Sequence, residues 1–223
     1  EFYYNDAGVQ MDRFGASVLA AIKGESTPEG GYPGEYVTEL GRRVLEARPD
    51  ILSLPADEQL VAARDDAYAL QLTEIEGSLA KFNVHFDVWF SEKTLHDPRG
   101  NGPSEIAEMI DEFRKRDLVY DGRLPPPKGQ LPEDWEDREQ VLFRSSTAGD
   151  DVDRPLVKSD GSYTYFANDI AYHRSKFVRG FPEMIDVWGA DHGGYVKRMQ
   201  AAVKAVTVQV LILLGRLGEL RIP

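Results

Sequence analysis

Apolar residues recur at helical spacing in several stretches of the chain. In the first stretch Val9, Phe14, Val18 and Ile22 fall on one face of a helix. Further on, Ser104 is a favourable N-cap in front of another such pattern. The spacing predicts helices over residues 9–22, 35–47, 57–82 and 104–117.

Strands are indicated between these helices by alternation of apolar and polar residues. Val84, Phe86, Val88 and Phe90 lie on one side of an extended segment, which predicts a half-buried strand over residues 84–90. Further strands are expected over residues 1–4, 141–144 and 184–188. Residues 124–135 are expected to form an irregular, proline-rich loop.

One stretch, residues 158–173 with the sequence KSDGSYTYFANDIAYH, opens with a predicted turn. Asp160-Gly161 is a tight-turn pair, and residues 162–166 alternate β-forming side chains after it. We therefore expect a short hairpin that leads into a strand.

A helix is expected directly after that strand. Asn168 is a favourable N-cap, which puts Asp169 in the first turn, where the positive end of the helix dipole favours a carboxylate. Tyr172 and His173 follow Asp169 at i+3 and i+4, on the same face. A carboxylate, a phenol and an imidazole at the mouth of a helix are suited to a cationic, planar ligand.

A second segment repeats this arrangement about twenty residues later. Residues 184–188 form an apolar strand, Gly189 gives the bend, and Asp191-His192 opens a helix over residues 194–205. In open α/β sheets, ligands bind at the carboxyl ends of such strands.

Composition narrows the class of protein. Hydrophobic residues make up 42% of the chain, enough for a core, and there is no cysteine. Disulfides and cysteine-ligated zinc are thereby excluded, and a reducing, cytoplasmic location is expected. We expect no membrane segment and no signal peptide, since no apolar run reaches the length of about eighteen residues that a span needs. Because the sequence begins with Glu1, we expect a piece of a longer protein.

Charge is distributed unevenly. The net charge is −12, and residues 50–151 hold all of the excess, with 23 acidic and 11 basic side chains. This balance argues against a phosphate-binding surface there and favours a solvated face. Arg114-Lys115-Arg116 ends a predicted helix, where cations complement the dipole; contact with nucleic acid is the alternative.

The sequence resembles the catalytic domain of bacterial arginyl-tRNA synthetases, which are class I aminoacyl-tRNA synthetases. The resemblance runs in the family's order from residue 1 to about residue 206. It is carried by five segments: EFYYNDAGVQMDRFGASV (1–18), FDVWFSEKTL (86–95), LFRSSTAGDDVDRPLVKSDG (142–161), SDGSYTYFANDIAYH (159–173) and VWGADHGGYVKRM (187–199).

The resemblance implies an α/β fold, namely part of the Rossmann-like nucleotide-binding fold of class I synthetases with an inserted α+β module. Residues 1–63 would end the first half of the catalytic domain, residues 64–150 would form the inserted module, and residues 151–223 would form the second half. The tail at 207–223 departs most from the family.

The resemblance also implies a reaction and its partners. Arginine would react with ATP, accompanied by Mg²⁺, and the arginyl group would pass to tRNA-Arg in the cytoplasm. The family's H-I-G-H and K-M-S-K-S motifs do not occur in the sequence. We expect a monomer, no membrane association and no protein-bound metal. The alternative is a non-catalytic binding remnant or decayed paralogue of the synthetase.

By resemblance, three residues hold the substrate arginine. Asp169 matches the carboxylate that pairs with the guanidinium, Tyr165 matches the tyrosine that flanks the substrate side chain, and His192 reaches the amino acid or the nucleotide. A carboxylate suits this role because it accepts two parallel hydrogen bonds from the planar guanidinium fork. The alternative for Asp169 is an ordinary acid in a first helical turn.

A second group would lie beside the adenylate. It consists of Gly189, Ala190 and Asp191, since glycine lets a ligand approach the backbone and the following helix N-terminus favours polar or negative groups. The chain has Gly193 where many relatives have a second histidine, which leaves any role of that side chain in doubt.

Three further candidates have structural alternatives. Asn5 and Asp6 follow the first strand and are expected either to hold substrate or the tRNA acceptor end, or simply to form a turn and a helix cap. His173 is a further candidate, although a lone histidine on a helix face is more often structural. His173, Asp191 and His192 do not suit a metal, because two of them are adjacent and diverge.

Overall fold

The computed structural model describes residues 1–126, 137–206 and 212–216 of the chain. Most of the predicted loop at 124–135 and most of the tail at 207–223 lie outside these described residues. The chain divides into two compact units, Glu1–Lys93 and Thr94–Pro223, each of which is described here by itself.

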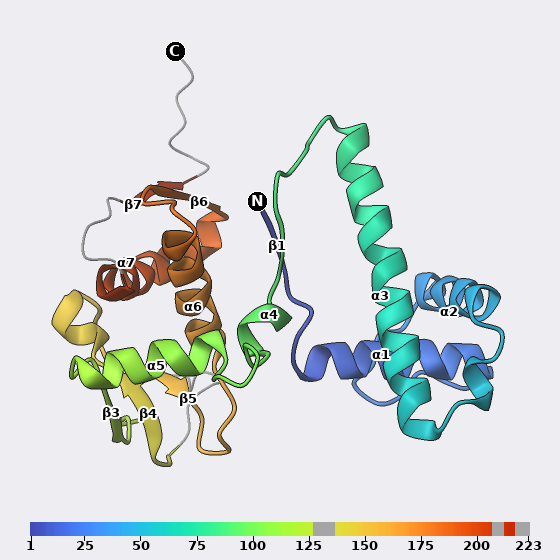
Figure 1. The fold of residues 1–223 in the computed structure, drawn as a ribbon, viewed down its shortest axis with the longest axis horizontal. Coiled ribbons are helices and arrows are strands. Elements are labelled where there is room, and N and C mark those ends of the chain that lie inside the picture. The colour runs from blue at the N-terminus through green and yellow to red at the C-terminus, as the bar shows by residue number, and fades with distance from the viewer. Residues whose placement is uncertain (127–136, 207–211, 217–223) are drawn as a thin grey trace. The chain divides into compact units, whose positions relative to one another are not determined.

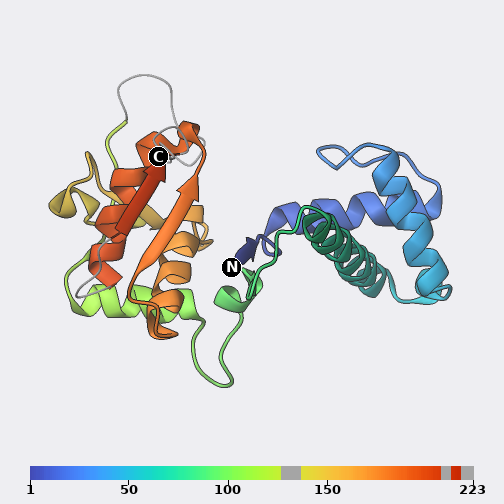
Figure 2. The ribbon, with the colours of Figure 1, turned by 90° about the horizontal axis from the view of Figure 1, so that it is seen from above.

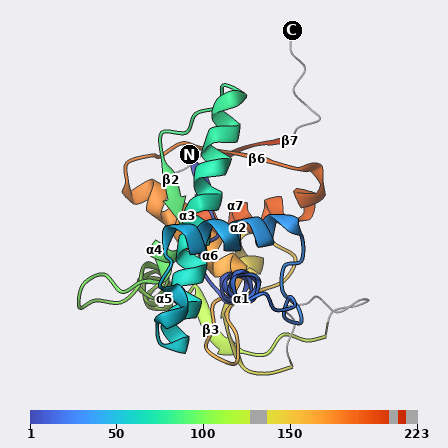
Figure 3. The same cartoon turned by 90° about the vertical axis from the view of Figure 1, so that its right-hand side faces the viewer.

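Three helices form the body of the first unit (Figure 1). They are α1 (Val9–Lys23), α2 (Glu35–Ala47) and α3 (Ala56–Lys81), with a short 3₁₀ turn, η1 (Ile51–Ser53), before α3. These bounds confirm the helices predicted from apolar spacing to within one residue. Figure 3 shows α2 in front of α1, which is seen nearly end on.

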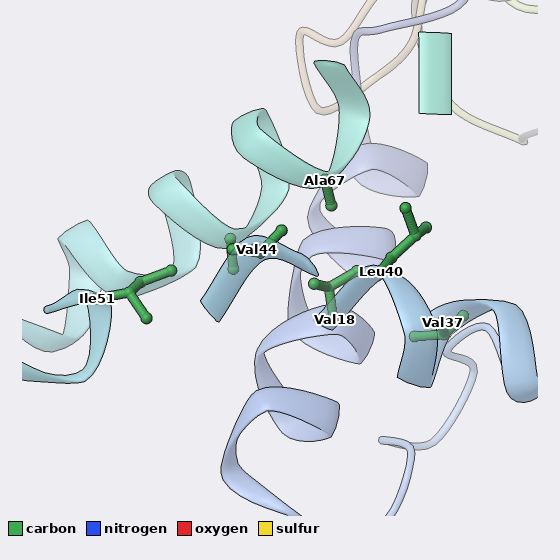
Figure 4. Packing of buried hydrophobic residues seen from close by; sticks show 7 residues of the cluster. Val18, Val37, Leu40, Val44, Ile51 and Ala67 are labelled. Carbon is green, nitrogen blue, oxygen red and sulfur yellow. The ribbon is translucent and has the colours of Figure 1, made fainter. Parts of the chain in front are cut away.

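Aliphatic side chains from all three helices and η1 meet in one buried cluster. Figure 4 shows them pointing toward one another between the helices. The buried members are Val18, Val37, Leu40, Val44, Ile51, Ala63 and Ala67. Removing this apolar surface from water stabilises the unit.

Helices α1 and α3 pack closely at Gly15. A Cβ atom placed on Gly15 would lie 2.6 Å from the Cβ of Arg64 on α3. Real Cβ atoms do not approach other atoms so closely, so only glycine fits this position without a shift of one helix.

The first unit also holds a pair of parallel strands, β1 (Phe2–Tyr4) and β2 (Trp89–Ser91). Phe2 pairs with Trp89 and Tyr4 with Ser91, so both strands end at the same edge. The predicted strand at 84–90 is therefore largely wrong. Pairing with β1 covers Trp89–Ser91, and the Val88 carbonyl accepts from the Phe2 N–H at 2.8 Å. Within the described residues, no strand is assigned over 84–88.

The second unit begins with a helix and a three-stranded antiparallel sheet. Helix α5 (Glu105–Lys115) is capped by Ser104 as predicted, because the Ser104 hydroxyl accepts from the Ala107 N–H at 3.3 Å. The other elements here are α4 (Lys93–His96), β3 (Val119–Gly122), β4 (Gln140–Phe143), η2 (Ser145–Ala148) and β5 (Arg154–Val157). The rings of Phe113 and Phe143 stack 5.3 Å apart between α5 and the sheet.

A second set of elements carries most of the predicted site. It consists of α6 (Tyr165–Val178), β6 (Met184–Trp188), the 3₁₀ turn η3 (Ala190–Gly194), α7 (Tyr195–Val206) and β7 (Ile212–Arg216). Figure 2 shows β6 and β7 side by side, and they pair in parallel. The strand and helix predicted at 184–188 and 194–205 are confirmed.

The start of α6 corrects two predictions. The helix begins at Tyr165, four residues before Asp169, so Asp169 lies in the second turn and Asn168 is a buried interior residue. The predicted strand at 162–166 is reduced to one isolated bridge between Val157 and Tyr163. Thr164 ends the extended segment because its hydroxyl caps the helix.

None of the helices in the described ranges combines the length and apolar composition that a membrane span requires. The resemblance divides the chain into the segments 1–63, 64–150 and 151–223. Their boundaries differ from that of the two compact units. They stay a prediction.

Candidate functional site

Thr164 fixes the start of α6. Its Oγ accepts from the Ala167 N–H at 3.2 Å and donates to the Pro155 carbonyl at 2.8 Å, which ties the helix to β5. The first helical residue, Tyr165, is 64% exposed. Asp169 follows one turn later on the same face and is half-buried. The phenol and the carboxylate expected to hold arginine therefore share the outward side of α6.

The Asp169 carboxylate is held by a residue from α7. The hydroxyl of Tyr195 donates to Asp169 Oδ2 at 2.5 Å. A phenol is a neutral donor, so this hydrogen bond orients the carboxylate without cancelling its charge.

His173 follows Asp169 one turn further along α6, where the helix is covered, and is 4% exposed. It donates through Nδ1 to the Asp169 carbonyl at 2.7 Å and through Nε2 to Asp186 Oδ2 at 2.9 Å. Both partners are acceptors, and the two contacts anchor the ring inside the second unit. This position fits the structural alternative for His173.

Lys176 is a second partner of Asp186. Lys176 Nζ lies 3.3 Å from Asp186 Oδ1 and 4.2 Å from the centre of the Tyr172 ring. Burial raises the pKa of the Asp186 carboxyl, but the hydrogen bond and charge of His173 and the charge of Lys176 outweigh burial and lower that pKa to about 2. Asp186 is therefore ionised and fully paired inside the protein.

The second predicted group lies on the connection from β6 to α7. The backbone turns at Gly189, whose carbonyl accepts from the His192 N–H at 3.1 Å, and the His192 side chain is exposed. Ala190 and Asp191 lie in η3, and their side chains lie outside the described part of the structure.

Aromatic rings join this connection to Asp169. The Trp188 ring lies 6.2 Å from the His192 ring and 5.6 Å from the Tyr195 ring. Because Tyr195 in turn binds Asp169, the structure brings the two predicted groups into one region.

Asn5 and Asp6 lie in the first unit, at the carboxyl ends of β1 and β2. Asp6 accepts from the Ser91 hydroxyl at 2.6 Å and from the Lys93 N–H at 2.8 Å. The Asn5 amide, oriented as a donor, bonds to Glu92 Oε1 at 3.2 Å. These contacts fit the alternative in which both residues shape a turn.

Three polar residues of these regions were not singled out from the sequence. Glu92 is 4% exposed and accepts from the Tyr3 hydroxyl. In the second unit, Asp186 bonds to His173, and Tyr195 donates to Asp169. Glu92 and Asp186 could have been found from the sequence, because each is a charged residue inside or directly after an apolar strand. Nothing local marks Tyr195, whose partner lies 26 residues away.

Two of the three basic residues at 114–116 bond to other residues of the second unit. Arg114 pairs with Asp121 through two bonds of 2.9 and 3.1 Å, and Arg116 donates to the Ala205 carbonyl at 2.5 Å. Both contacts favour a structural role over nucleic-acid binding. Within the described residues, no group of three or more His, Cys, Asp or Glu side chains is arranged to hold a metal ion.

Comparisons with known proteins bear on this site. No protein-family model matches the chain. Over 214 residues the chain is 54% identical to the arginine–tRNA ligase of Bradyrhizobium sp. (strain ORS 278), which covers 93% of this chain. The arginine–tRNA ligase of Methylorubrum extorquens (strain PA1) is 54% identical over 213 residues, again 93% of this chain. The chain is homologous to part of these ligases.

The matched part is a minority of each relative. The chain spans 35% of the Bradyrhizobium ligase and 36% of the Methylorubrum ligase. A solved arginyl tRNA synthetase from Campylobacter jejuni matches 96% of this chain and 44% of its own, with a TM-score of 0.74 and 28% identity. The mixed α/β arrangement of the chain therefore resembles part of a synthetase.

Proposed function

We propose that the chain is part of an arginine–tRNA ligase and that its second unit binds the arginine side chain. In this proposal the chain contributes to the Rossmann-like fold of a class I synthetase. The observation that carries the proposal is the Asp169 carboxylate, which lies half-exposed beside the exposed Tyr165 and is held by a neutral donor.

A guanidinium is recognised by shape as well as charge. It stays protonated at every physiological pH and presents its N–H groups as a planar fork, which a carboxylate accepts through two parallel hydrogen bonds. Asp169 is the counter-ion in this proposal, and the ring of Tyr165 flanks the apolar stem of the substrate. Lysine presents a single ammonium and does not satisfy the same pair of acceptors.

The reaction proceeds in two steps. The arginine carboxylate attacks the α-phosphorus of ATP, which releases pyrophosphate and gives arginyl-adenylate; a terminal ribose hydroxyl of tRNA-Arg then takes the arginyl group and AMP leaves. Mg²⁺ accompanies the ATP phosphates. Gly189, Ala190 and Asp191 line the adenylate side, and His192 contacts the amino acid or nucleotide. The residues of this chain act by positioning the substrates.

The partners follow from that reaction. They are arginine, ATP and tRNA-Arg, and the proposed protein is a cytoplasmic monomer. Sedimentation of the full-length ligase tests its oligomeric state.

The experiment changes Asp169 alone. In the full-length ligase, Asp169→Asn keeps the shape of the side chain and removes its charge. We expect the KM for arginine in ATP–pyrophosphate exchange to rise by the equivalent of roughly 2–5 kcal/mol, as for a truncated buried charge pair, while the KM for ATP changes little.

The matched control is Asp111→Asn, an exposed acid on α5, which should leave both KM values unchanged. Equal losses for arginine and ATP in Asp169→Asn would contradict the assignment.

A further inference from the structure

A buried hydrogen-bonded network joins α6 to β6 within the second unit. Asp186 of β6 is 9% exposed, and its Oδ2 lies 2.9 Å from Nε2 of His173 on α6. Its other oxygen, Oδ1, lies 3.3 Å from Nζ of Lys176, which follows His173 by one turn on the same helix. One carboxylate of the strand is therefore bonded to two side chains of the helix.

The network reaches both parts of the proposed site. On α6, Nδ1 of His173 lies 2.7 Å from the carbonyl oxygen of Asp169, the residue assigned to the arginine side chain. On β6, the chain runs from Asp186 to Gly189, where the connection that carries His192 begins. The His173 ring therefore links the backbone of Asp169 to the strand that leads to the adenylate side.

Burial and the shape of the ring make this link stiff. An imidazole is a rigid ring, so its two nitrogens cannot shift independently toward their partners. His173 is 4% exposed, so water does not replace a contact that the ring loses, and a buried polar group left without its partner is costly. The link therefore fixes the spacing between Asp169 and β6.

We propose that His173 is a positioning residue, which through Asp186 sets the spacing between the arginine side of the site on α6 and the adenylate side on the β6–α7 connection. This inference rests on the proposed function. Adenylate formation requires the carboxylate of arginine to be aligned with the α-phosphorus of ATP, and a displacement of about 1 Å can lower a rate about a hundredfold. Each substrate is bound by contacts within its own side of the site. Loss of the link should therefore lower kcat and leave both KM values nearly unchanged.

The test compares two substitutions of His173 in the full-length ligase. In His173→Gln the side-chain amide reaches the place of Nε2 and keeps a donor for Asp186. In His173→Asn the shorter amide reaches only the place of Nδ1, so the bond to β6 is lost while the contact with the Asp169 carbonyl is kept. We expect kcat of ATP–pyrophosphate exchange, measured with tRNA-Arg present, to fall about tenfold in His173→Asn and to stay within about twofold of wild type in His173→Gln. The KM values for arginine and ATP should change little in either variant.

Ser17→Ala is the control for the loss of buried hydrogen bonds. Ser17 is 2% exposed in the first unit, and its hydroxyl donates to the Arg13 carbonyl at 2.7 Å and accepts from the Tyr32 N–H at 2.9 Å. This variant should lose stability, as His173→Asn does, and keep kcat within about twofold of wild type. Circular dichroism at the assay temperature verifies that each variant is folded.

Asp186→Glu carries the same test if His173→Asn does not fold. It keeps the carboxylate and lengthens the link by one methylene group, so kcat should again fall while both KM values are retained.

The outcomes separate this inference from the proposed function. If Asp169→Asn raises the arginine KM but kcat of His173→Asn, or of Asp186→Glu in its place, stays within about twofold of wild type, His173 only stabilises the fold and the positioning role is wrong. Equal losses of kcat in His173→Gln and His173→Asn would contradict the role of the bond to Asp186. If Asp169→Asn itself leaves the arginine KM unchanged, the proposed function is wrong and the role of His173 goes with it.

Discussion

Two carboxylates lie close to α6, Asp186 of β6 and Asp169 of α6 itself, and their surroundings differ. Asp186 is buried and is bonded to His173 and Lys176. On the outward side Asp169 is met by the neutral hydroxyl of Tyr195 and lies beside the exposed ring of Tyr165. The first carboxylate belongs to a buried network, whereas we propose that the second, at a half-buried position, binds the guanidinium of the substrate.

This difference identifies a binding carboxylate better than position alone. Asp6 also follows a strand, yet it accepts from Ser91 and from a backbone N–H and serves the fold. A carboxylate oriented by neutral donors at a partly open position is the one that we assign to substrate.

The largest expected effect concerns catalysis by the chain alone. The H-I-G-H and K-M-S-K-S motifs, which by resemblance supply the groups that stabilise charge on the ATP phosphates, do not occur in the sequence. The 223-residue chain should give no arginine-dependent ATP–pyrophosphate exchange. The full-length ligase is the control, and measurable exchange by the chain would contradict this expectation.

The next effect separates the two carboxylates by stability. Asp186→Asn leaves the buried His173 and the partly buried Lys176 without their carboxylate partner, so the free energy of unfolding should fall by about 3 kcal/mol. Asp169→Asn should cost about 1 kcal/mol or less, because it weakens one hydrogen bond at a partly exposed position. Urea unfolding at neutral pH measures both, and equal losses would erase the distinction.

Acid should reduce the free energy of unfolding that the ionised Asp186 contributes. The pKa of Asp186 lies at about 2 in the folded chain, below its ordinary value of 3.8. Its stabilisation is present above about pH 4 and is lost as the pH falls through about 2. At about 1.4 kcal/mol per pKa unit this amounts to about 2 kcal/mol.

The measurement is urea unfolding of wild type and Asp186→Asn between pH 6 and about pH 2. The difference between the two proteins should shrink as the pH falls. A difference that stays constant over this range would contradict the pairing of Asp186.

The smallest expected effect concerns Thr164, whose hydroxyl caps the start of α6. Thr164→Ala removes the hydroxyl that bonds to Ala167 and Pro155, and should cost about 1 kcal/mol of unfolding free energy. Thr164→Ser keeps the hydroxyl and should retain most of the stability. If Thr164→Ser loses as much unfolding free energy as Thr164→Ala, the packing of the threonine methyl group accounts for the loss and the hydroxyl cap does not.

Helices were predictable from the sequence where they pack as amphipathic elements. On α2, Val37, Leu40 and Val44 recur at the spacing that a helix brings to one side, and they belong to the core of the first unit. Strand 184–188 was predictable from its apolar run, although its faces differ: Met184 is buried and Ile185 is 70% exposed.

Alternation and capping signals were less decisive. The pattern at 84–90 gives no information about a partner, and β1 pairs only with Trp89–Ser91. Thr164 and Asn168 are both good caps in isolation. The hydrogen bond from Thr164 to Pro155 of β5 decides between them, and that contact is tertiary.

The site was predictable in its residue types and less so in its geometry. Tyr165, expected in the strand before the helix, is the first residue of α6 and so shares a helical face with Asp169. Asp169 itself lies one turn further into α6 than expected. The buried place of His173 and the role of Tyr195 depend on partners on β6 and α7, which local patterns do not encode.

The contact between Gly15 and Arg64 has a consequence for how natural relatives vary. With 2.6 Å between the Arg64 Cβ and any Cβ at position 15, the two positions are sterically coupled. A homologue that carries alanine or serine at the first position should carry glycine at the second, or have α1 and α3 spread apart. Paired substitution at these two sites across many genomes would therefore record the packing of the three-helix unit without another structure.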